Sequence, residues 1–288
     1  LLKGYRSRRF VRSKLHMANY LSSYPHDGGI SLLLNKKCDL NLNYSLLWRS
    51  KCEPLKRLIV SQLILNGFLE NQTILDIGAY IGDNSLPWLA LSAHLKQGIT
   101  VCAVDPSDDN INFIKQTAVH NRLEVQTFCT LISENAEDYS PLESWSHSSF
   151  HIVTDPAQVS IRSTTVDSLC AKSCFTNIGL MHIDVEGMEY SVLLGSQRII
   201  SSCRPLIIYE LHLNDPAHPQ PSALLHALNY KIYTINEIIF GNRPDCRNML
   251  AIPIERFNIL ELPFFSSPCT PQPELYPIVA GTPLIPYC

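Results

Sequence analysis

The alternation of strand-like and helix-like segments is the feature that most constrains this fold. Apolar runs of strand length recur at residues 73–78, 100–105, 124–131, 178–184 and 205–211. Apolar residues at helical spacing lie between them, namely Leu86, Leu89, Ala90 and Ala93, then Ile111, Ile114 and Ala118, and later Met188, Val192 and Ile199. Helices that connect successive strands act as crossovers, so the strands should be parallel and covered on both faces. The sequence therefore predicts a doubly wound, mostly parallel α/β sheet of the Rossmann-like type.

Three regions are predicted along the chain. Residues 1–69 form a partly helical extension. Its helix begins at Pro54, has one apolar face made of Leu55, Leu58, Ile59 and Leu63, and ends near Asn66-Gly67. Residues 70–256 form the main domain, where a helix near 222–228 and strands at 231–235 and 248–254 bring the sheet to seven strands. Residues 257–288 hold many prolines, which cannot support a regular helix or a central strand. We expect a wrapping tail or a partly disordered end.

Composition narrows the class of protein. The 288 residues are 45% hydrophobic and 17% charged, and no run of eighteen apolar residues predicts a membrane span. The net charge of -3 gives no general attraction for a nucleic acid. The basic run from Lys3 to Lys14 is interpreted as a solvated tail, with a tether for an anionic partner as the alternative. Ten cysteines lack zinc-site spacing, and Cys102 and Cys129 lie within apolar runs. We expect a cytoplasmic protein, and the missing initial Met is consistent with a fragment.

A glycine-containing loop follows the first predicted strand. Asp76 lies near the end of the strand, and Gly78 and Gly82 complete a D-x-G-x-x-x-G pattern before the next helix. Ligands of open α/β sheets bind at the carboxyl ends of the strands, and glycine lets the backbone approach them. A dinucleotide site would use G-x-G-x-x-G to bind pyrophosphate, which Asp76 would repel. The loop favours a cofactor with cationic groups, such as S-adenosylmethionine.

The second strand also ends in an acid, Asp105, 29 positions after Asp76. A carboxylate there can accept hydrogen bonds from both hydroxyls of a ribose. The alternative is that Asp105-Pro106-Ser107-Asp108 is only a turn and a helix cap. With the glycine loop upstream at the right spacing, we favour the ribose role.

Two further strands end in side chains that can accept or donate a proton. Asp184 ends the strand over 178–184 and is followed by Glu186, whereas Glu189 fits an ordinary first-turn acid of the next helix. On the strand over 205–211, Glu210 and His212 are two residues apart, so both side chains should face the same side. These four residues, Asp184, Glu186, Glu210 and His212, are the predicted reaction site.

At this point the sequence resembles the FkbM-type methyltransferases, over roughly residues 53 to 215. The resemblance is carried by residues 76–82, Val104-Asp105-Pro106, residues 164–169, the block Ile183-Asp184-Val185-Glu186-Gly187-Met188-Glu189 and Tyr209-Glu210-Leu211-His212. It implies a class I methyltransferase fold and a cofactor site made of Asp76, Gly78, Ala79, Tyr80, Gly82, Asp105, Pro106 and Asp184. Tyr80 stands where the family usually has Asn, and His182 where it usually has Lys. A similarly placed acid in the family approaches the site, but Glu53 fits a plain helix-start acid better.

The resemblance implies O-methylation of a hydroxyl on a sugar, a glycolipid or a polyketide-type metabolite, with S-adenosylmethionine as the methyl donor. We expect in-line transfer with His212 or Asp184 as base and with Glu186 and Glu210 orienting the acceptor. No dedicated metal site is predicted, although Asp184 and Glu186 could serve a metal-assisted variant. A catalytically silent cofactor-binding module is a further alternative. The sequence lacks the pyrophosphate-binding glycine pattern of an oxidoreductase, and it lacks the Asn-Pro-Pro-Tyr-like block that amine-methylating enzymes of this fold often carry.

Overall fold

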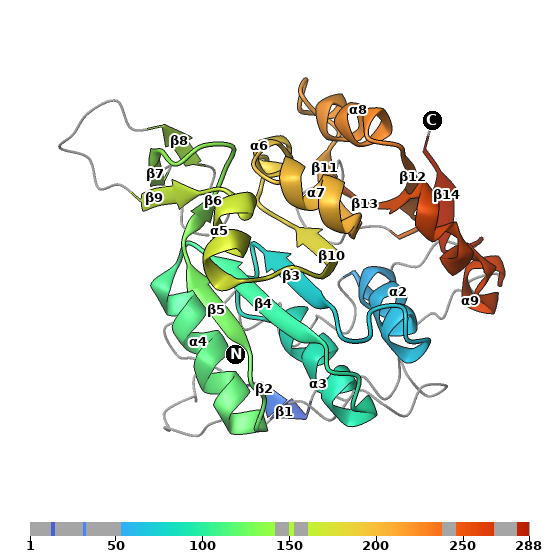
Figure 1. The fold of residues 1–288 in the computed structure, drawn as a ribbon, viewed down its shortest axis with the longest axis horizontal. Helices are drawn as coiled ribbons and strands as arrows, with labels where there is room; N and C mark the ends of the chain where they lie inside the picture. The colour runs from blue at the N-terminus through green and yellow to red at the C-terminus, as the bar shows by residue number, and fades with distance from the viewer. Residues whose placement is uncertain are drawn as a thin grey trace, which may run out of the picture.

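An eight-stranded sheet forms the centre of the molecule (Figure 1). The structure is a computed structural model that describes residues 13–14, 31–32, 53–141, 150–152, 161–237, 246–267 and 281–287. The strand order is β14-β12-β13-β11-β10-β3-β4-β5. The strands are β3 (Thr73–Ile77), β4 (Thr100–Asp105), β5 (Gln126–Cys129), β10 (Ile178–Ile183), β11 (Leu206–His212), β12 (Tyr230–Ile235), β13 (Cys246–Pro253) and β14 (Leu284–Pro286).

The strands are parallel from β11 to β5 and alternate in direction from β11 to β14. The pairs β11–β10, β10–β3, β3–β4 and β4–β5 are parallel, whereas β13 is antiparallel to β11, and β12 is antiparallel to both β13 and β14. The chain order reverses between β3 and β10, because β4 and β5 lie on one side of β3 and the later strands lie on the other. Such a switch point is where open α/β sheets bind ligands, so the fold confirms the predicted doubly wound type.

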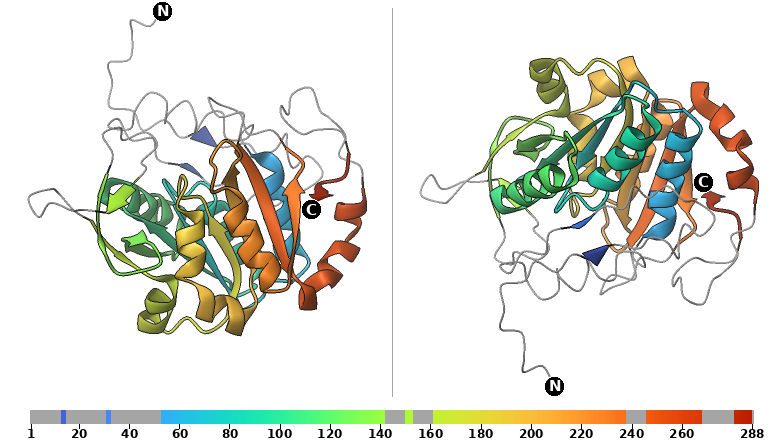
Figure 2. Two further views of the ribbon diagram at one scale, coloured as in Figure 1. Left: turned by 90° about the horizontal axis from the view of Figure 1, so that it is seen from above. Right: turned by 90° about the horizontal axis from the view of Figure 1, so that it is seen from below.

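Helices cover both faces of the sheet, as Figures 1 and 2 show. One face packs on α2 (Pro54–Leu65), α3 (Ser85–Leu95) and α4 (Asp108–Asn121), and the other on α5 (Val166–Ser173), α6 (Glu189–Leu194), α7 (Gln197–Cys203) and α8 (Pro219–Ala227). Side chains alternate between these cores along each strand. In β3, Ile74 joins the α2–α3 core, while Leu75 and Ile77 join the opposite one.

The apolar run at 124–131 is not one strand. β5 ends at Cys129, and Leu131–Ile132 forms β6, the first strand of a separate small sheet. That sheet has the order β6-β9-β7-β8, with β7 (Asp138–Pro141), β8 (Phe150–Ile152) and β9 (Ile161–Thr164). A two-stranded ribbon of β1 (Ser13–Lys14) and β2 (Ser31–Leu32) is also present. The rest of the basic run that begins at Lys3 lies outside the described residues.

The helix expected to carry Met188, Val192 and Ile199 is two helices, α6 and α7, so that expectation is wrong. The break falls at Gly195, where an added Cβ would lie 2.2 Å from the carbonyl oxygen of Ser133. This close approach of two backbones requires a residue without a Cβ at that point.

The proline-rich tail contributes more regular structure than expected. A 3₁₀ segment (Ile254–Glu261) leads into α9 (Pro263–Ser266), which begins with Pro263 at a position where a helix tolerates proline. β14 then pairs with β12 and forms the edge of the sheet, which therefore has eight strands and not seven. Edge strands tolerate proline, in agreement with Pro286 in β14. Within the described ranges, no helix has the length and apolar character that a membrane crossing requires.

Candidate active site

The glycine loop after β3 lies directly on the segment that follows β10. Gly78 has φ +81° and donates its N–H to Val104 O at 2.9 Å. An added Cβ on Gly78 would lie 1.8 Å from the carbonyl oxygen of Asp184, so no other residue fits without movement of one backbone. Tyr80 and Gly82 also have positive φ values, 51° and 78°. The predicted cofactor loop and the predicted reaction strand are thus in contact.

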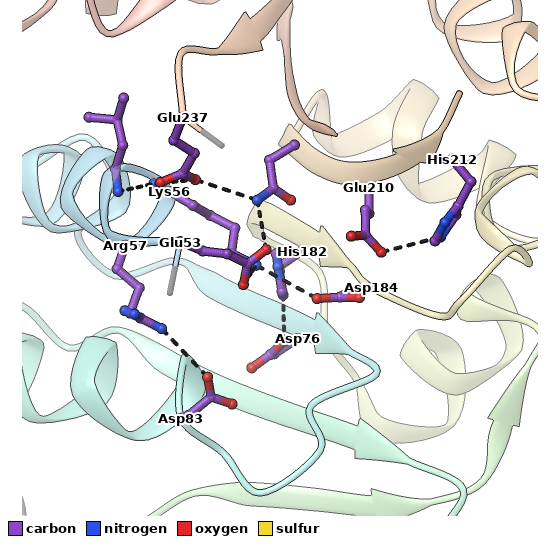
Figure 3. Close-up of polar contacts among 12 residues, drawn as sticks. Glu53, Lys56, Arg57, Asp76, Asp83, His182, Asp184, Glu210, His212 and Glu237 are labelled. Atoms are coloured by element: carbon purple, nitrogen blue, oxygen red, sulfur yellow. Dashed lines mark hydrogen bonds and ion pairs between the residues drawn. The ribbon is translucent and has the colours of Figure 1, made fainter. Parts of the chain in front are cut away.

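Asp76 lies beneath this loop. Its side chain is fully buried, with Oδ1 2.7 Å from Nδ1 of His182 (Figure 3). Its Oδ2 accepts a hydrogen bond from the hydroxyl of Ser85. Trp88 packs edge-on against the His182 ring, with centroids 5.6 Å apart. The carboxylate therefore links β3, β10 and the start of α3. Its contact with a cofactor ammonium stays a prediction, and in this geometry Asp76 supports the loop from below.

Asp105 closes the other side of the loop. Its Oδ2 accepts the backbone N–H of Tyr80 at 2.8 Å, and its Oδ1 accepts from Ser107 N at 2.9 Å and Asn110 Nδ2 at 3.0 Å. Burial raises the pKa of Asp105 to about 6, although these donors act to lower it. Ser107 caps α4, because its hydroxyl accepts from Asn110 N, and Ser107 N donates to Asp105 Oδ1. The turn and helix cap considered for residues 105–108 are therefore present, and the ribose role of Asp105 stays a prediction. Pro106 separates Asp105 from Ser107.

The tips of β10 and β11 bring three carboxylates together. Oxygen atoms of Asp184, Glu186 and Glu210 lie within 4.8 Å of one another. Burial and the nearby charge of Glu210 raise the pKa of Asp184 well above its ordinary value. Glu189 instead accepts the backbone N–H groups of Val185 (3.2 Å) and Gly187 (3.1 Å), which agrees with its expected role at the helix start.

His212 lies between two partners. Its Nε2 is 3.2 Å from Glu210 Oε2, so the two side chains share one side of β11 as predicted. Its Nδ1 is 3.3 Å from Sγ of Cys246, which is its register partner on the neighbouring strand β13. Glu210, His212 and Cys246 are all metal-ligating residue types and all are buried. The two ring nitrogens of His212, however, face different partners.

Lys56 is a site residue that the sequence analysis missed. Its side chain is fully buried, with Nζ 2.9 Å from Glu53 Oε2 and 3.6 Å from Asp184 Oδ2 (Figure 3). Burial alone would lower the pKa of Lys56, but Glu53 and Asp184 raise it well above its ordinary value. One signal was present in the sequence, because Lys56 shares a helical stripe with the buried Val60 and Ile64.

Glu237 is a second residue that the sequence analysis missed, and the interpretation of Glu53 as a plain helix-start acid is wrong, because its side chain does not cap the helix. Glu53 precedes α2 with φ 48° but makes no side-chain cap bond, and it points instead to Lys56 and to Asn248 Nδ2 (2.8 Å). Lys56 holds the pKa of Glu53 at about 2 against the effect of burial. The start of α2 is capped by Glu237, which accepts from Leu55 N at 2.7 Å and Lys56 N at 3.2 Å. Burial and Glu53 raise the pKa of Glu237 to about 7.

A doubly wound sheet with a glycine loop after its first central strand and acids at the neighbouring strand tips defines a Rossmann-like methyltransferase. A comparison with protein-family models matches residues 76–232 to the methyltransferase FkbM domain, which is more than half of the chain. The chain therefore belongs to the FkbM methyltransferase family and is an S-adenosylmethionine-dependent methyltransferase. A comparison with curated proteins finds no match.

Solved structures show distant similarity. An FkbM methyltransferase from Methylobacillus flagellatus KT is 15% identical, with a TM-score of 0.43 over 62% of this chain and 43% of that one. This chain therefore spans less than half the length of that protein. A putative caffeoyl-CoA O-methyltransferase from Staphylococcus aureus is 12% identical, with a TM-score of 0.46 over 83% and 99% of the two chains. The METTL16 methyltransferase domain is 16% identical, with a TM-score of 0.43 over 82% and 78%.

Proposed function

We propose that this protein transfers the methyl group of S-adenosylmethionine to a hydroxyl of a sugar, a glycolipid or a polyketide-type metabolite. The observation that carries the proposal is the contact between the glycine loop and the tip of β10. The backbone carbonyl of Asp184 lies directly beside Gly78, and the carboxylates of Glu186 and Glu210 lie near that of Asp184. His212 lies next to Glu210, on the far side of this group. A cofactor held by the loop would then face groups that can bind and deprotonate a hydroxyl.

The loop residues fit this cofactor. The cofactor would lie along the backbone of Gly78, Ala79, Tyr80 and Gly82, whose N–H groups donate within the protein. Asp105 accepts three protein hydrogen bonds, which leaves about one of its four acceptor positions for a ribose hydroxyl. Our expectation of two ribose hydroxyls on Asp105 therefore requires one protein donor to move. Pro106 would flank the sugar, and Asp76 would fix the loop from beneath.

When bound, S-adenosylmethionine supplies a methyl group on a positively charged sulfur, which needs no further activation. The chain's own task is to align the acceptor, and alignment can supply an effective concentration on the order of 10⁵ M or more. Its second task is to remove the hydroxyl proton. Asp184 suits this role because its raised pKa brings its basicity nearer to neutral pH. His212 is the other candidate base, and Glu186 and Glu210 would orient the hydroxyl.

A screen of the purified chain with methyl-labelled cofactor against sugar, glycolipid and polyketide acceptors tests this function. Asp184→Asn and His212→Ala are the matched site variants, and Asp109→Asn on the exposed surface of α4 is the control. We expect turnover to fall in at least one site variant and to persist in the control. Normal turnover in both site variants would remove their assignment. Cofactor binding without transfer to any acceptor would support the silent binding module instead.

A metal-assisted form of the same reaction is a second candidate. It is favoured by the clustering of oxygen atoms from Asp184, Glu186 and Glu210 within 4.8 Å, since hard divalent cations bind carboxylates. Turnover measured with and without EDTA, followed by Mg²⁺ addition, separates the two forms. Only the metal-assisted reaction should stop in the chelator and recover with the ion.

A further inference from the structure

We propose that Arg57 is a positioning residue of the cofactor site, which fixes the end of the glycine loop through an ion pair with Asp83. Arg57 belongs to α2, and α2 lies before residue 76, where the match to the FkbM family begins. The inference thus extends the cofactor site to a helix that the family match does not cover. It rests on the proposed function for the place of the cofactor along residues 78–82, and it does not depend on the acceptor.

The ion pair between Arg57 and Asp83 is nearly closed to solvent. Arg57 Nη1 lies 3.6 Å from Asp83 Oδ2, and only 8% and 10% of the two side chains are exposed (Figure 3). Ion pairs on an open surface contribute little, because water competes for both charges. The loss of one partner of a buried pair is costly, since it leaves an uncompensated charge. The position of the Asp83 carboxylate is therefore tied to that of Arg57.

Asp83 lies where the glycine loop enters α3. It directly follows Gly82, which has φ +78° and whose carbonyl oxygen accepts the backbone N–H of Leu86 in the first turn of the helix. Asn84 occupies the N-cap position of α3 but makes no side-chain cap bond, and the first turn carries no acid. A side-chain cap therefore does not fix this end of the loop, whereas Asp83 joins it to α2.

Two further contacts hold the earlier part of the loop. Gly78 packs against the carbonyl oxygen of Asp184, and the backbone N–H of Tyr80 donates to Asp105 Oδ2 at 2.8 Å. Both contacts lie within the residues that the family match covers. The ion pair with α2 adds a contact at the end of the loop, so the backbone along which the cofactor would lie is held at its beginning, middle and end.

The start of α2 is itself fixed to the far side of the sheet. Glu237, at the end of β12, accepts the backbone N–H groups of Leu55 at 2.7 Å and Lys56 at 3.2 Å. Leu55 and Ile59 are buried in the core beneath this helix. Arg57 therefore projects from an anchored helix turn, and movement of the loop end away from this turn would have to separate the ion pair.

Calorimetry with S-adenosylhomocysteine on the full chain tests the effect on the cofactor site. In Arg57→Met and in Asp83→Asn we expect the Kd to rise about 10-fold. The double variant Arg57→Met/Asp83→Asn should bind no more weakly than either single variant, because both changes remove the same contact. Arg57→Lys keeps the charge and should recover most of the affinity. An unchanged Kd in folded Arg57→Met, or single effects that multiply in the double variant, would overturn the proposal.

Amide hydrogen exchange without any ligand tests the loop directly. The N–H of Leu86, which is bonded to Gly82 O, reports on the end of the loop. In Arg57→Met its exchange should become at least about 10-fold faster relative to the amides of β4. Arg256→Met is the matched control, because Arg256 is a half-buried cation that donates to Gly179 O and Phe68 O, at the amino end of β10 and away from the loop. It should change neither this ratio nor the Kd.

The remaining outcomes also decide the question. If Arg57→Met does not fold, Asp83→Asn is compared with the double variant, which buries no unpaired charge. Weaker binding by the double variant than by Asp83→Asn would reject the proposal, because Arg57 would then act through another group. If the unmodified chain does not bind S-adenosylhomocysteine, the proposed cofactor site fails. The exchange of Leu86 still shows in that case whether Arg57 fixes the loop, and an unchanged ratio in Arg57→Met would reject it.

Discussion

His182 and Asp76 are register partners on the adjacent parallel strands β10 and β3, and Nδ1 of His182 lies 2.7 Å from Oδ1 of Asp76. Both side chains are buried beneath the glycine loop. The pair joins the strand that carries the cofactor loop to the strand that carries Asp184. His182 therefore has a structural role, at a position where the FkbM family usually has Lys.

Replacing His182 by Leu should lower the free energy of unfolding by about 2–4 kcal/mol, because the buried Asp76 would keep only the Ser85 hydroxyl as a donor. His182→Lys should lose less, since an ammonium can pair with the carboxylate. Urea denaturation followed by circular dichroism measures both. The control is His120→Leu on the exposed side of α4, which should stay within about 0.5 kcal/mol. Equal losses at positions 182 and 120 would show that the pair is unimportant.

Stability should depend on pH through Glu237. The folded state keeps the proton on Glu237 up to about pH 7, whereas an ordinary Glu releases it near 4.5. The folded state therefore binds more protons than the unfolded chain in this window, and its contribution to stability is lost as pH rises from about 4.5 to 7. The loss amounts to about 3 kcal/mol for a shift of this size.

The comparison of Glu237→Gln with the unmodified chain isolates this effect. The Gln side chain does not titrate, so the difference in unfolding free energy between the two proteins should change by about 3 kcal/mol between pH 4.5 and 7.5, in favour of the unmodified chain at low pH. Glu261→Gln, at an exposed position, serves as the matched control. A pH-independent difference for Glu237→Gln would contradict the raised pKa.

The acids at the strand tips could be predicted because parallel strands end at one edge of a sheet. That rule placed Asp76, Asp105, Asp184 and Glu210 near one another, and period-two geometry placed His212 beside Glu210. It could not show which of these acids faces a ligand, since the burial of Asp76 depends on Ser85 and His182 from two other elements.

Contacts between segments far apart in the sequence were beyond local patterns. Glu237 caps α2 across 182 positions, and it is this cap that holds Lys56 toward Asp184. Gly195, between α6 and α7, likewise packs against the backbone of Ser133, which is distant in the sequence. Helical periodicity reports which face of a segment is apolar, but it carries no information on the partner that the face will meet.

Cofactor affinity should depend on Asp105 and on its protonation. Asp105→Asn removes a charged acceptor, so we expect the Kd for S-adenosylhomocysteine to rise about 10-fold or more. In the unmodified chain the affinity should fall as pH drops through about 6, the pKa to which burial raises this carboxyl, because the protonated group is a poorer acceptor. Isothermal titration calorimetry at pH 8 and pH 5.5 measures both effects. Asp109→Asn, on the exposed face of α4, should bind normally at both pH values.

Two glycines at the site allow the effect of close packing on stability and binding to be separated from the effect of backbone conformation. Gly78 and Gly187 both have positive φ, +81° and +104°, so alanine is strained at either position, by about 1–2 kcal/mol. At Gly187 the added methyl group would meet no atom within 4 Å, whereas at Gly78 it would lie 1.8 Å from the Asp184 carbonyl oxygen. Gly78→Ala must therefore push the cofactor loop away from the tip of β10.

Thermal unfolding and calorimetry with S-adenosylhomocysteine should show a modest loss of stability with intact binding for Gly187→Ala. They should show a larger loss, with binding weakened at least about 10-fold, for Gly78→Ala. Equal behaviour of the two variants would mean that the contact between the loop and β10 is not what holds the site together.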